Sequence, residues 1–155
     1  MKKGQVVIFL LTIIVALTGS VITDLGMNWY GMINLPNFTP PGAMIGLVWT
    51  LIFILAMVSA MIIWRRKEFS RIYRQQIMIL FGVNAFLNIF WSFLFFSAHS
   101  LYFSIWEAGL LGLSVLALII SIWPKSKTAA SLLIPYFLWV SFATYLTYSV
   151  WLLNK

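Results

Sequence analysis

Apolar residues gather in five long runs along the chain, separated by short polar stretches. Each run is about 20 residues long, which is the length that an α-helix needs to cross the hydrocarbon core of a bilayer. Proline and glycine punctuate the pattern, with Pro40-Pro41-Gly42 before the second run and Pro124 after the fourth. The pattern predicts an all-α integral membrane protein, a single domain over 1–155 in which one bundle of helices spans 6–22, 43–64, 77–98, 101–123 and 129–153.

Composition supports a bilayer rather than water as the solvent. Hydrophobic residues make up 63% and charged residues 8% of the chain, against about 45–50% and 25% in soluble domains. The absence of Cys excludes a disulfide framework, a thiolate metal site and a cysteine nucleophile. One His and three acidic residues leave little for hydrolytic chemistry, so we expect no metal site and no required cofactor.

Basic residues predict the orientation of the bundle. With five spans, nine of the ten basic residues fall on one side of the membrane: Lys2, Lys3, Arg65, Arg66, Lys67, Arg71, Arg74, Lys125 and Lys127. The positive-inside rule then places the N-terminus in the cytoplasm and the C-terminus outside, in the cell membrane. The segment 65–74 is short and lies beside the membrane, so we expect it to contact lipid headgroups and not nucleic acid.

The connection between the first two predicted helices, 23–42, is the one long loop. It contains Trp29, Tyr30 and Phe38 together with three prolines, which stiffen it. A loop of this length in a small bundle is commonly a lid or a binding loop. Two interpretations stay open, an aromatic cap at the level of the headgroups and an ordered lid that closes over a cavity in the bundle.

This loop resembles the signature of the translocator protein family, also called the TspO/MBR, peripheral benzodiazepine receptor or tryptophan-rich sensory protein family. The family pattern W-Y-x-x-L-x-K-P-x-W-x-P-P, followed by V-W, is matched at Trp29, Tyr30, Pro36, Pro40, Pro41, Val48 and Trp49. Ile33, Leu35 and Phe38 depart from it, standing where the family has Leu, Lys and Trp.

Two further segments resemble the same family in the same order. The third run contains Asn88-Ile89-Phe90-Trp91-Ser92, then Phe95-Phe96, similar to N-x-x-W-[PS]-x-x-F-F. The fifth contains Pro135-Tyr136, Trp139 and Phe142-Ala143-Thr144, similar to P-Y-x-x-W-x-x-F-A-T. The resemblance covers nearly the whole chain and is closest to bacterial-type members.

The resemblance implies a membrane receptor that binds protoporphyrin IX and other hydrophobic or drug-like aromatic ligands, with a role in tetrapyrrole regulation or stress response. It also implies two alternatives, light-dependent breakdown of the porphyrin and transport of porphyrin or another small molecule. Specific cholesterol binding is not expected, because Leu152 stands where the family's cholesterol motif needs a basic residue after Leu146 and Tyr148.

Residue spacing points to the same region of the bundle. Asn84, Asn88, Trp91, Ser92 and Phe95 share one face of a helix, and amides are costly against lipid, so this face should look inward. Trp49, Trp91 and Trp139 lie deeper than an interfacial belt would place them. The predicted ligand-binding residues are Tyr30, Pro40, Trp49, Phe53, Asn84, Asn88, Trp91, Trp139 and Ala143. For Asn84, hydrogen bonding between helices stays open as an equal alternative. If the porphyrin is degraded, Trp49 and Trp139 are the predicted catalytic residues, because indoles are oxidisable.

Two other features carry open alternatives. Glu107 is the only acid within a predicted span, and we expect it to accept hydrogen bonds from the bundle or to serve a ligand or a proton. Ala108-x-x-x-Gly112 and Gly42-x-x-x-Gly46 permit close helix packing, either within the chain or in a homodimer.

Overall fold

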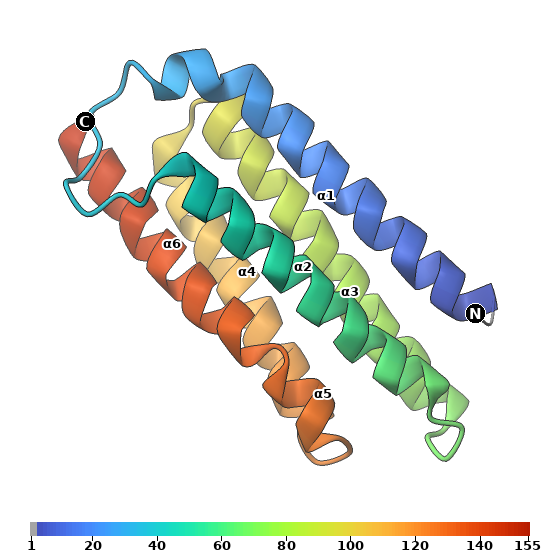
Figure 1. Cartoon of the computed structure of the whole chain (residues 1–155). Helices are drawn as coiled ribbons and strands as arrows, with labels where there is room; N and C mark the ends of the chain where they lie inside the picture. The colour runs from blue at the N-terminus through green and yellow to red at the C-terminus, as the bar shows by residue number, and fades with distance from the viewer. Residues whose placement is uncertain (1–2) are drawn as a thin grey trace.

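The fold is a bundle of long antiparallel helices, seen in a computed structural model that describes residues 3–155 (Figure 1). Within these residues, five helical segments are long and apolar enough to cross a membrane, which confirms the five predicted spans. The elements in chain order are α1 (Lys3–Tyr30), α2 (Gly42–Arg65), α3 (Arg71–Ser92), the π-helical turn η1 (Phe93–Ser97), α4 (Leu101–Ile122), α5 (Lys127–Ser131) and α6 (Ile134–Leu153).

Helix α4 lies at the centre of the packing, against α3 on one side and α6 on the other, and it also contacts η1 and α5. One face of α4 is buried along its whole length, from Ser104 to Ile122. Helix α1 instead lies at the edge of the bundle against α2, α3 and η1 (Figure 1), and Gly26 is its only buried residue.

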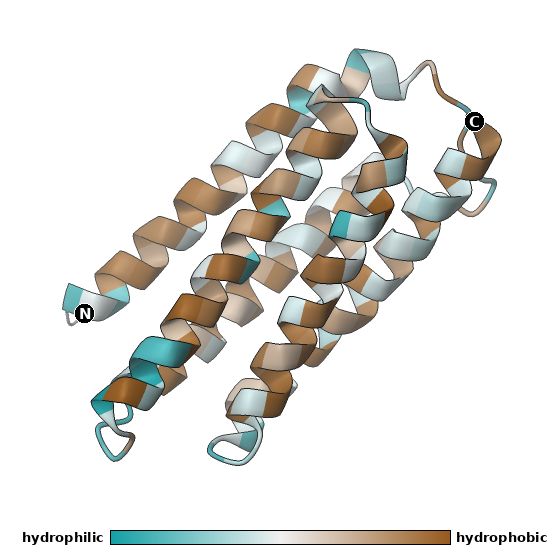
Figure 2. Cartoon of the chain, turned by 180° about the vertical axis from the view of Figure 1, so that it is seen from behind, coloured by the Kyte–Doolittle hydropathy of each residue, from teal (hydrophilic) through white to brown (hydrophobic). Residues whose placement is uncertain are grey.

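The two ends of the bundle differ in chemistry. The first end carries Lys3, the α2–α3 connection with its arginines, and the α4–α5 connection, and we call it the basic end; hydrophilic colour marks it in Figure 2. The opposite end, which we call the loop end, carries residues 31–41, the turn at 98–100 and the C-terminus. Lys2 lies outside the described residues. The grouping of the other basic residues agrees with the orientation that the positive-inside rule predicts.

The first helix is longer than predicted, so the boundaries 6–22 for the helix and 23–42 for the loop are wrong. Helix α1 continues to Tyr30, and the loop covers only 31–41. The extra turns are held by packing: an added Cβ at Gly26 would come within 2.5 Å of the Phe96 carbonyl oxygen, and the Trp29 ring stacks on His99 at 4.2 Å. Tertiary contact therefore keeps this polar-looking segment helical.

The third and fifth helices also differ from the predicted ranges of 77–98 and 129–153. Helix α3 begins at Arg71, because the Ser70 side chain accepts a hydrogen bond from the Tyr73 amide and caps it. The last span is interrupted between α5 and α6. Pro135 lies in the first turn of α6, where its missing N–H is tolerated, whereas a continuous helix would lose the hydrogen bond to residue 131.

The loop 31–41 is fastened to the end of α6. The Asn154 side chain accepts a hydrogen bond from the backbone N–H of Asn34 at 2.9 Å and donates one to the backbone carbonyl of Asn34 at 2.8 Å. The Phe38 ring stacks on Tyr145 at 5.5 Å and meets Phe142 edge-on. The loop is therefore ordered and lies over the outer surface of α6.

Candidate functional site

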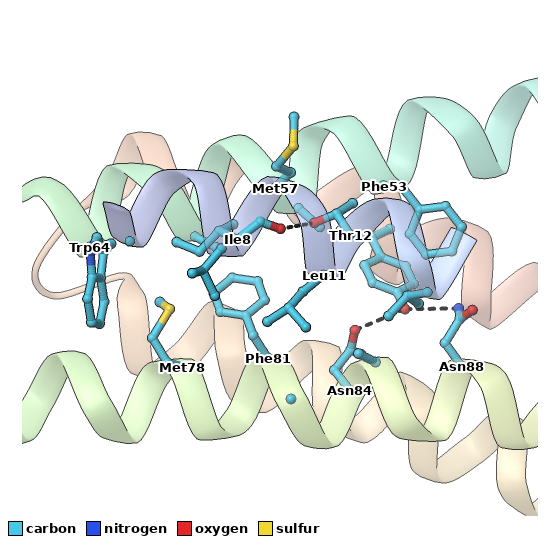
Figure 3. A pocket seen from close by; sticks show the side chains of 18 residues that line it. Ile8, Leu11, Thr12, Phe53, Met57, Trp64, Met78, Phe81, Asn84 and Asn88 are labelled. Carbon is cyan, nitrogen blue, oxygen red and sulfur yellow. Dashed lines mark hydrogen bonds between the residues drawn. The ribbon is translucent and has the colours of Figure 1, made fainter. Parts of the chain in front are cut away.

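An apolar cavity of about 400 Å³ lies between α1, α2 and α3, in the half of the bundle nearer the basic end (Figure 3). Trp64 and Met78 lie at one end of it, and Phe53 and Asn88 at the other. Its lining residues come from three helices and one residue of α6: Gly4, Val7, Ile8, Leu11, Thr12, Val15, Phe53, Ala56, Met57, Ala60, Trp64, Met78, Phe81, Gly82, Asn84, Ala85, Asn88 and Tyr136.

The deep end of the cavity is polar. The Tyr136 hydroxyl donates to Asn84 Oδ1 at 3.1 Å and accepts from Asn88 Nδ2 at 3.3 Å. Asn84 Nδ2 in turn donates to Ser114 Oγ at 2.8 Å. These bonds join α3, α4 and α6, and they satisfy amides that would be costly in a membrane interior. The network fixes the three helices and presents amide and phenol groups to one end of the cavity.

The cavity also opens to the outer surface of the bundle. Val7 and Leu11 line it and yet are 53% and 56% exposed, and Gly82 on α3 is exposed as well. In a membrane this surface faces lipid tails. A hydrophobic molecule dissolved in the bilayer could therefore reach the cavity between α1 and α3 without passing through water.

Of the nine predicted ligand-binding residues, the structure brings Phe53, Asn84 and Asn88 to the cavity wall. Trp49 lies directly behind them: its ring is 5.8 Å from Phe53 and 6.1 Å from Tyr136, both of which line the cavity. Sequence spacing thus located the polar end of the cavity and the aromatic residue behind it.

The other five predicted residues lie elsewhere. Tyr30 and Trp91 belong to an aromatic cluster at the loop end, around Phe95 and Phe96. The Trp139 ring packs on Phe142, 5.4 Å away. The remaining two, Pro40 and Ala143, are also absent from the cavity wall, and no residue of 31–41 lines it. The lid interpretation is therefore wrong for this cavity.

Sequence reasoning missed the contribution of α1, which supplies a third of the lining residues. Trp64 was also not among the predicted site residues, although its indole closes one end of the cavity. Gly4 is the residue that could have indicated the contact between α1 and Trp64. A Cβ added at Gly4 would overlap the Trp64 indole, so glycine at this position lets α1 and the indole come close together. A glycine near the start of an otherwise apolar helix indicates close packing.

Glu107 and the small-residue motifs have definite places. Glu107 is buried, at 4% exposure, and neither carboxylate oxygen accepts a hydrogen bond from residues 3–155. The hydrogen bonds expected from the bundle are thus not seen among these residues, and a role for a ligand or a proton stays a prediction. Ala108 is buried, and a Cβ at Gly112 would lie 3.5 Å from Val140 Cγ1, so this motif serves α4–α6 packing within the chain. An added Cβ at Gly42 or Gly46 meets no atom within 4 Å, and their use in a homodimer stays a prediction.

Comparison with known proteins gives a consistent match. The sequence pattern of the TspO/MBR family matches residues 7–152. The chain is 34% identical over 154 residues to "Tryptophan-rich protein TspO" of Bacillus cereus, covering 99% of both chains. It is 32% identical over 127 residues to a protein of the same name in Archaeoglobus fulgidus, covering 82% of this chain and 80% of the other. It is also 27% identical over 128 residues to the human "Translocator protein", covering 81% and 75%.

Proposed function

The chain belongs to the TspO/MBR family, and on that premise we propose that it is a cell-membrane receptor that binds porphyrins, such as protoporphyrin IX, in the α1–α2–α3 cavity. The observation that carries the proposal is the form of this cavity, apolar along its length and polar only at its deep end. Ligand sites for flat hydrophobic molecules have this form, a concave apolar wall with a few fixed polar groups.

The chemistry of the wall supports a large aromatic ligand. Phe53 and Phe81 offer ring surfaces on two different helices, and Met57 and Met78 supply flexible thioethers that adapt to an irregular ligand. The amides of Asn84 and Asn88 can hydrogen-bond a polar edge of the macrocycle. The opening between α1 and α3 gives a membrane-dissolved ligand a direct route.

A binding titration with a matched pair of variants tests the proposal. Gly82 lines the cavity, whereas Gly109 on α4 does not, and an added Cβ meets nothing within 4 Å at either. Both Gly→Leu substitutions remove a helical glycine, but only Gly82→Leu occupies the cavity. Protoporphyrin IX is titrated into nanodiscs that carry each protein, and the shift of the porphyrin absorption band is followed.

We expect saturable binding to the wild-type protein and to Gly109→Leu, and at least tenfold weaker binding to Gly82→Leu, since lost contact with one ring face is worth more than about 1.4 kcal/mol. Binding that never saturates would contradict the proposed function. Equal affinity in the two variants would place the porphyrin outside this cavity.

One observation favours a second candidate function, light-dependent degradation of the bound porphyrin. Trp49 packs against Phe53 and Tyr136, which line the cavity, so its indole could give an electron to an excited ligand next to that wall. The transfer leaves an indole radical cation and a porphyrin radical anion, and dissolved dioxygen is the oxidant for the breakdown that follows. Illuminated complex should then lose porphyrin absorbance faster than porphyrin in nanodiscs that contain Trp49→Phe. Equal rates would contradict this candidate and leave the receptor proposal standing.

A further inference from the structure

The apolar cavity adjoins a second cavity of about 510 Å³ at the basic end of the bundle. Trp64 lines both cavities. Gly4 lines the apolar one and its neighbour Gln5 lines the other, so the two meet at the start of α1. The second cavity is otherwise lined by charged side chains: Arg65, Lys67, Glu68 and Arg74.

Positive charge is in excess around this second cavity. The lining contains three cations and one acid, Glu68. Glu68 Oε1 lies 3.9 Å from Nη1 of Arg66, which is not a lining residue. Within residues 3–155, neither Arg65, Lys67 nor Arg74 takes part in an ion pair. The wall next to the apolar cavity is therefore a cationic surface, and none of its three cations is paired with an acid of residues 3–155.

Arg74 joins this surface to the apolar cavity. Its guanidinium lies over the Trp64 ring, 5.9 Å from the centroid, and Nη1 donates to the Trp64 carbonyl at 3.3 Å. Its Nε–H is buried and has no hydrogen-bond partner among the described residues. A buried donor without a partner is costly, and an acid group of a ligand beside Trp64 would supply the acceptor.

We propose that Arg74, Arg65 and Lys67 bind the carboxylates of an anionic, flat amphiphile whose apolar body occupies the α1–α2–α3 cavity. For a porphyrin these are its propionate groups, so the inference rests on the proposed function and deepens it. Guanidinium–carboxylate bonds are charge-assisted and among the stronger hydrogen bonds in proteins. The acid groups then stay at the basic end, at the level of the lipid headgroups, while the ring system lies in the apolar part.

The dimensions of the cavity agree with this orientation. Phe53 and Trp64 mark its two ends on α2, and eleven residues of helix span about 16 Å. A tetrapyrrole with extended propionate arms has this order of length. The deep end offers neutral amides and a phenol, whereas the other end offers cations, so the two ends of the ligand are distinguished by charge.

The experiment compares an acid with its neutral ester. Protoporphyrin IX and its dimethyl ester are titrated into nanodiscs of zwitterionic phosphatidylcholine that carry wild-type protein, Arg74→Gln, Arg65→Gln/Lys67→Gln or Lys125→Gln. Arg65 and Lys67 are exposed, so the double variant should fold even if Arg74→Gln does not. Lys125 is a matched control, since it removes a charge at the same end but lines neither cavity.

We expect the acid to bind the wild-type protein roughly tenfold more tightly than the ester, because hydrogen bonds to charged groups contribute about 1.5 kcal/mol or more. The Arg74 and double variants should lower the affinity for the acid five- to tenfold and leave the ester unchanged, and Lys125→Gln should change neither.

Equal binding of acid and ester by the wild-type protein would overturn the inference while the proposed function stands. If Arg74→Gln and Arg65→Gln/Lys67→Gln lower the affinity for acid and ester equally, the inference is also overturned, because the cations would then act only on the shape of the cavity. If neither compound binds saturably, the proposed function itself fails.

Discussion

The two halves of α1 have opposite relations to the rest of the bundle. At the loop end, Gly26 touches Phe96 and Trp29 stacks on His99, so the helix is packed as closely as a core. At the basic end, α1 contacts Trp64 of α2 at Gly4. From Gly4 to Val15, a cavity of about 400 Å³ lies between α1 and the helices α2 and α3. One helix thus packs closely at its loop end and lines a cavity along its other half.

The difference shows that apolar sequence does not by itself give close packing. The basic-end half of α1 is the more apolar of the two and forms a wall of the cavity, whereas the loop-end half carries Asp24 and Asn28 and makes the tight contacts. Residues that pack poorly against their neighbours contribute little stability, and such departures from close packing are expected at functional sites. We therefore propose that the loop end of α1 contributes mainly to stability and its basic end to ligand binding.

The largest effect is expected from the two glycines that mark these ends. An added Cβ at Gly26 meets backbone and Cβ atoms of Phe96 at 2.5–2.6 Å, so Gly26→Ala forces the helices apart and should destabilise the fold by roughly 2–3 kcal/mol. Gly4→Ala displaces only the Trp64 ring, and it gains helix propensity, so its cost should stay below about 1 kcal/mol.

Thermal unfolding of both variants in the same detergent measures this difference. A larger loss of stability in Gly4→Ala than in Gly26→Ala would contradict the view that the loop end of α1 contributes more to stability than the basic end. An equal loss of thermal stability in the two variants would show that both ends of α1 contribute equally to the stability of the fold.

A smaller effect is expected at the polar end of the cavity. Tyr136→Phe removes a hydroxyl that bonds both Asn84 and Asn88, and it should cost about 1 kcal/mol, the usual range for such bonds in membranes. Tyr145→Phe is the matched control, because its ring stacks on Phe38 and its hydroxyl bonds no described residue. Denaturation in sodium dodecyl sulfate compares them, and equal stability of the two variants would contradict a role for the network.

The smallest effect is expected from the loop 31–41. Asn154→Ala removes the two hydrogen bonds that its side chain makes with the Asn34 backbone, but these bonds are exposed, so stability should fall by less than about 1 kcal/mol. Cleavage by chymotrypsin at Phe38 should nevertheless become severalfold faster, whereas the loop substitution Asn37→Ala should leave it unchanged. Unchanged cleavage in Asn154→Ala would show that the aromatic contacts alone fasten the loop.

Hydropathy and motifs predicted the five spans, the basic end and the family, because bilayer thickness and charge bias act on the sequence residue by residue. The length of α1 was not predicted, since Asp24 and Asn28 look like loop residues. Ile22, Gly26 and Trp29 nevertheless share one helix face at i, i+4 and i+7, which indicated a continuing helix.

The candidate site was predicted only in part for a related reason. Asn84 and Asn88 were found because amides stand out in an apolar sequence, and Asn88 also holds a motif position. The α1 side of the cavity consists of ordinary aliphatic residues such as Val7 and Leu11, and nothing in a sequence separates a lining aliphatic residue from a packed one. Trp139 was grouped with the cavity by its depth in the membrane, but depth does not determine which neighbour a side chain meets.

The position of a bound porphyrin tests most directly whether the α1–α2–α3 cavity is its binding site. Crystals grown with zinc protoporphyrin allow the metal to be located by its anomalous scattering, independently of how the protein is traced. We expect a single zinc position enclosed by α1, α2 and α3, in the stretch of the cavity from Phe53 to Trp64, with the propionates toward Arg74. A zinc position beside Trp91 and Trp139, away from α1, would contradict it.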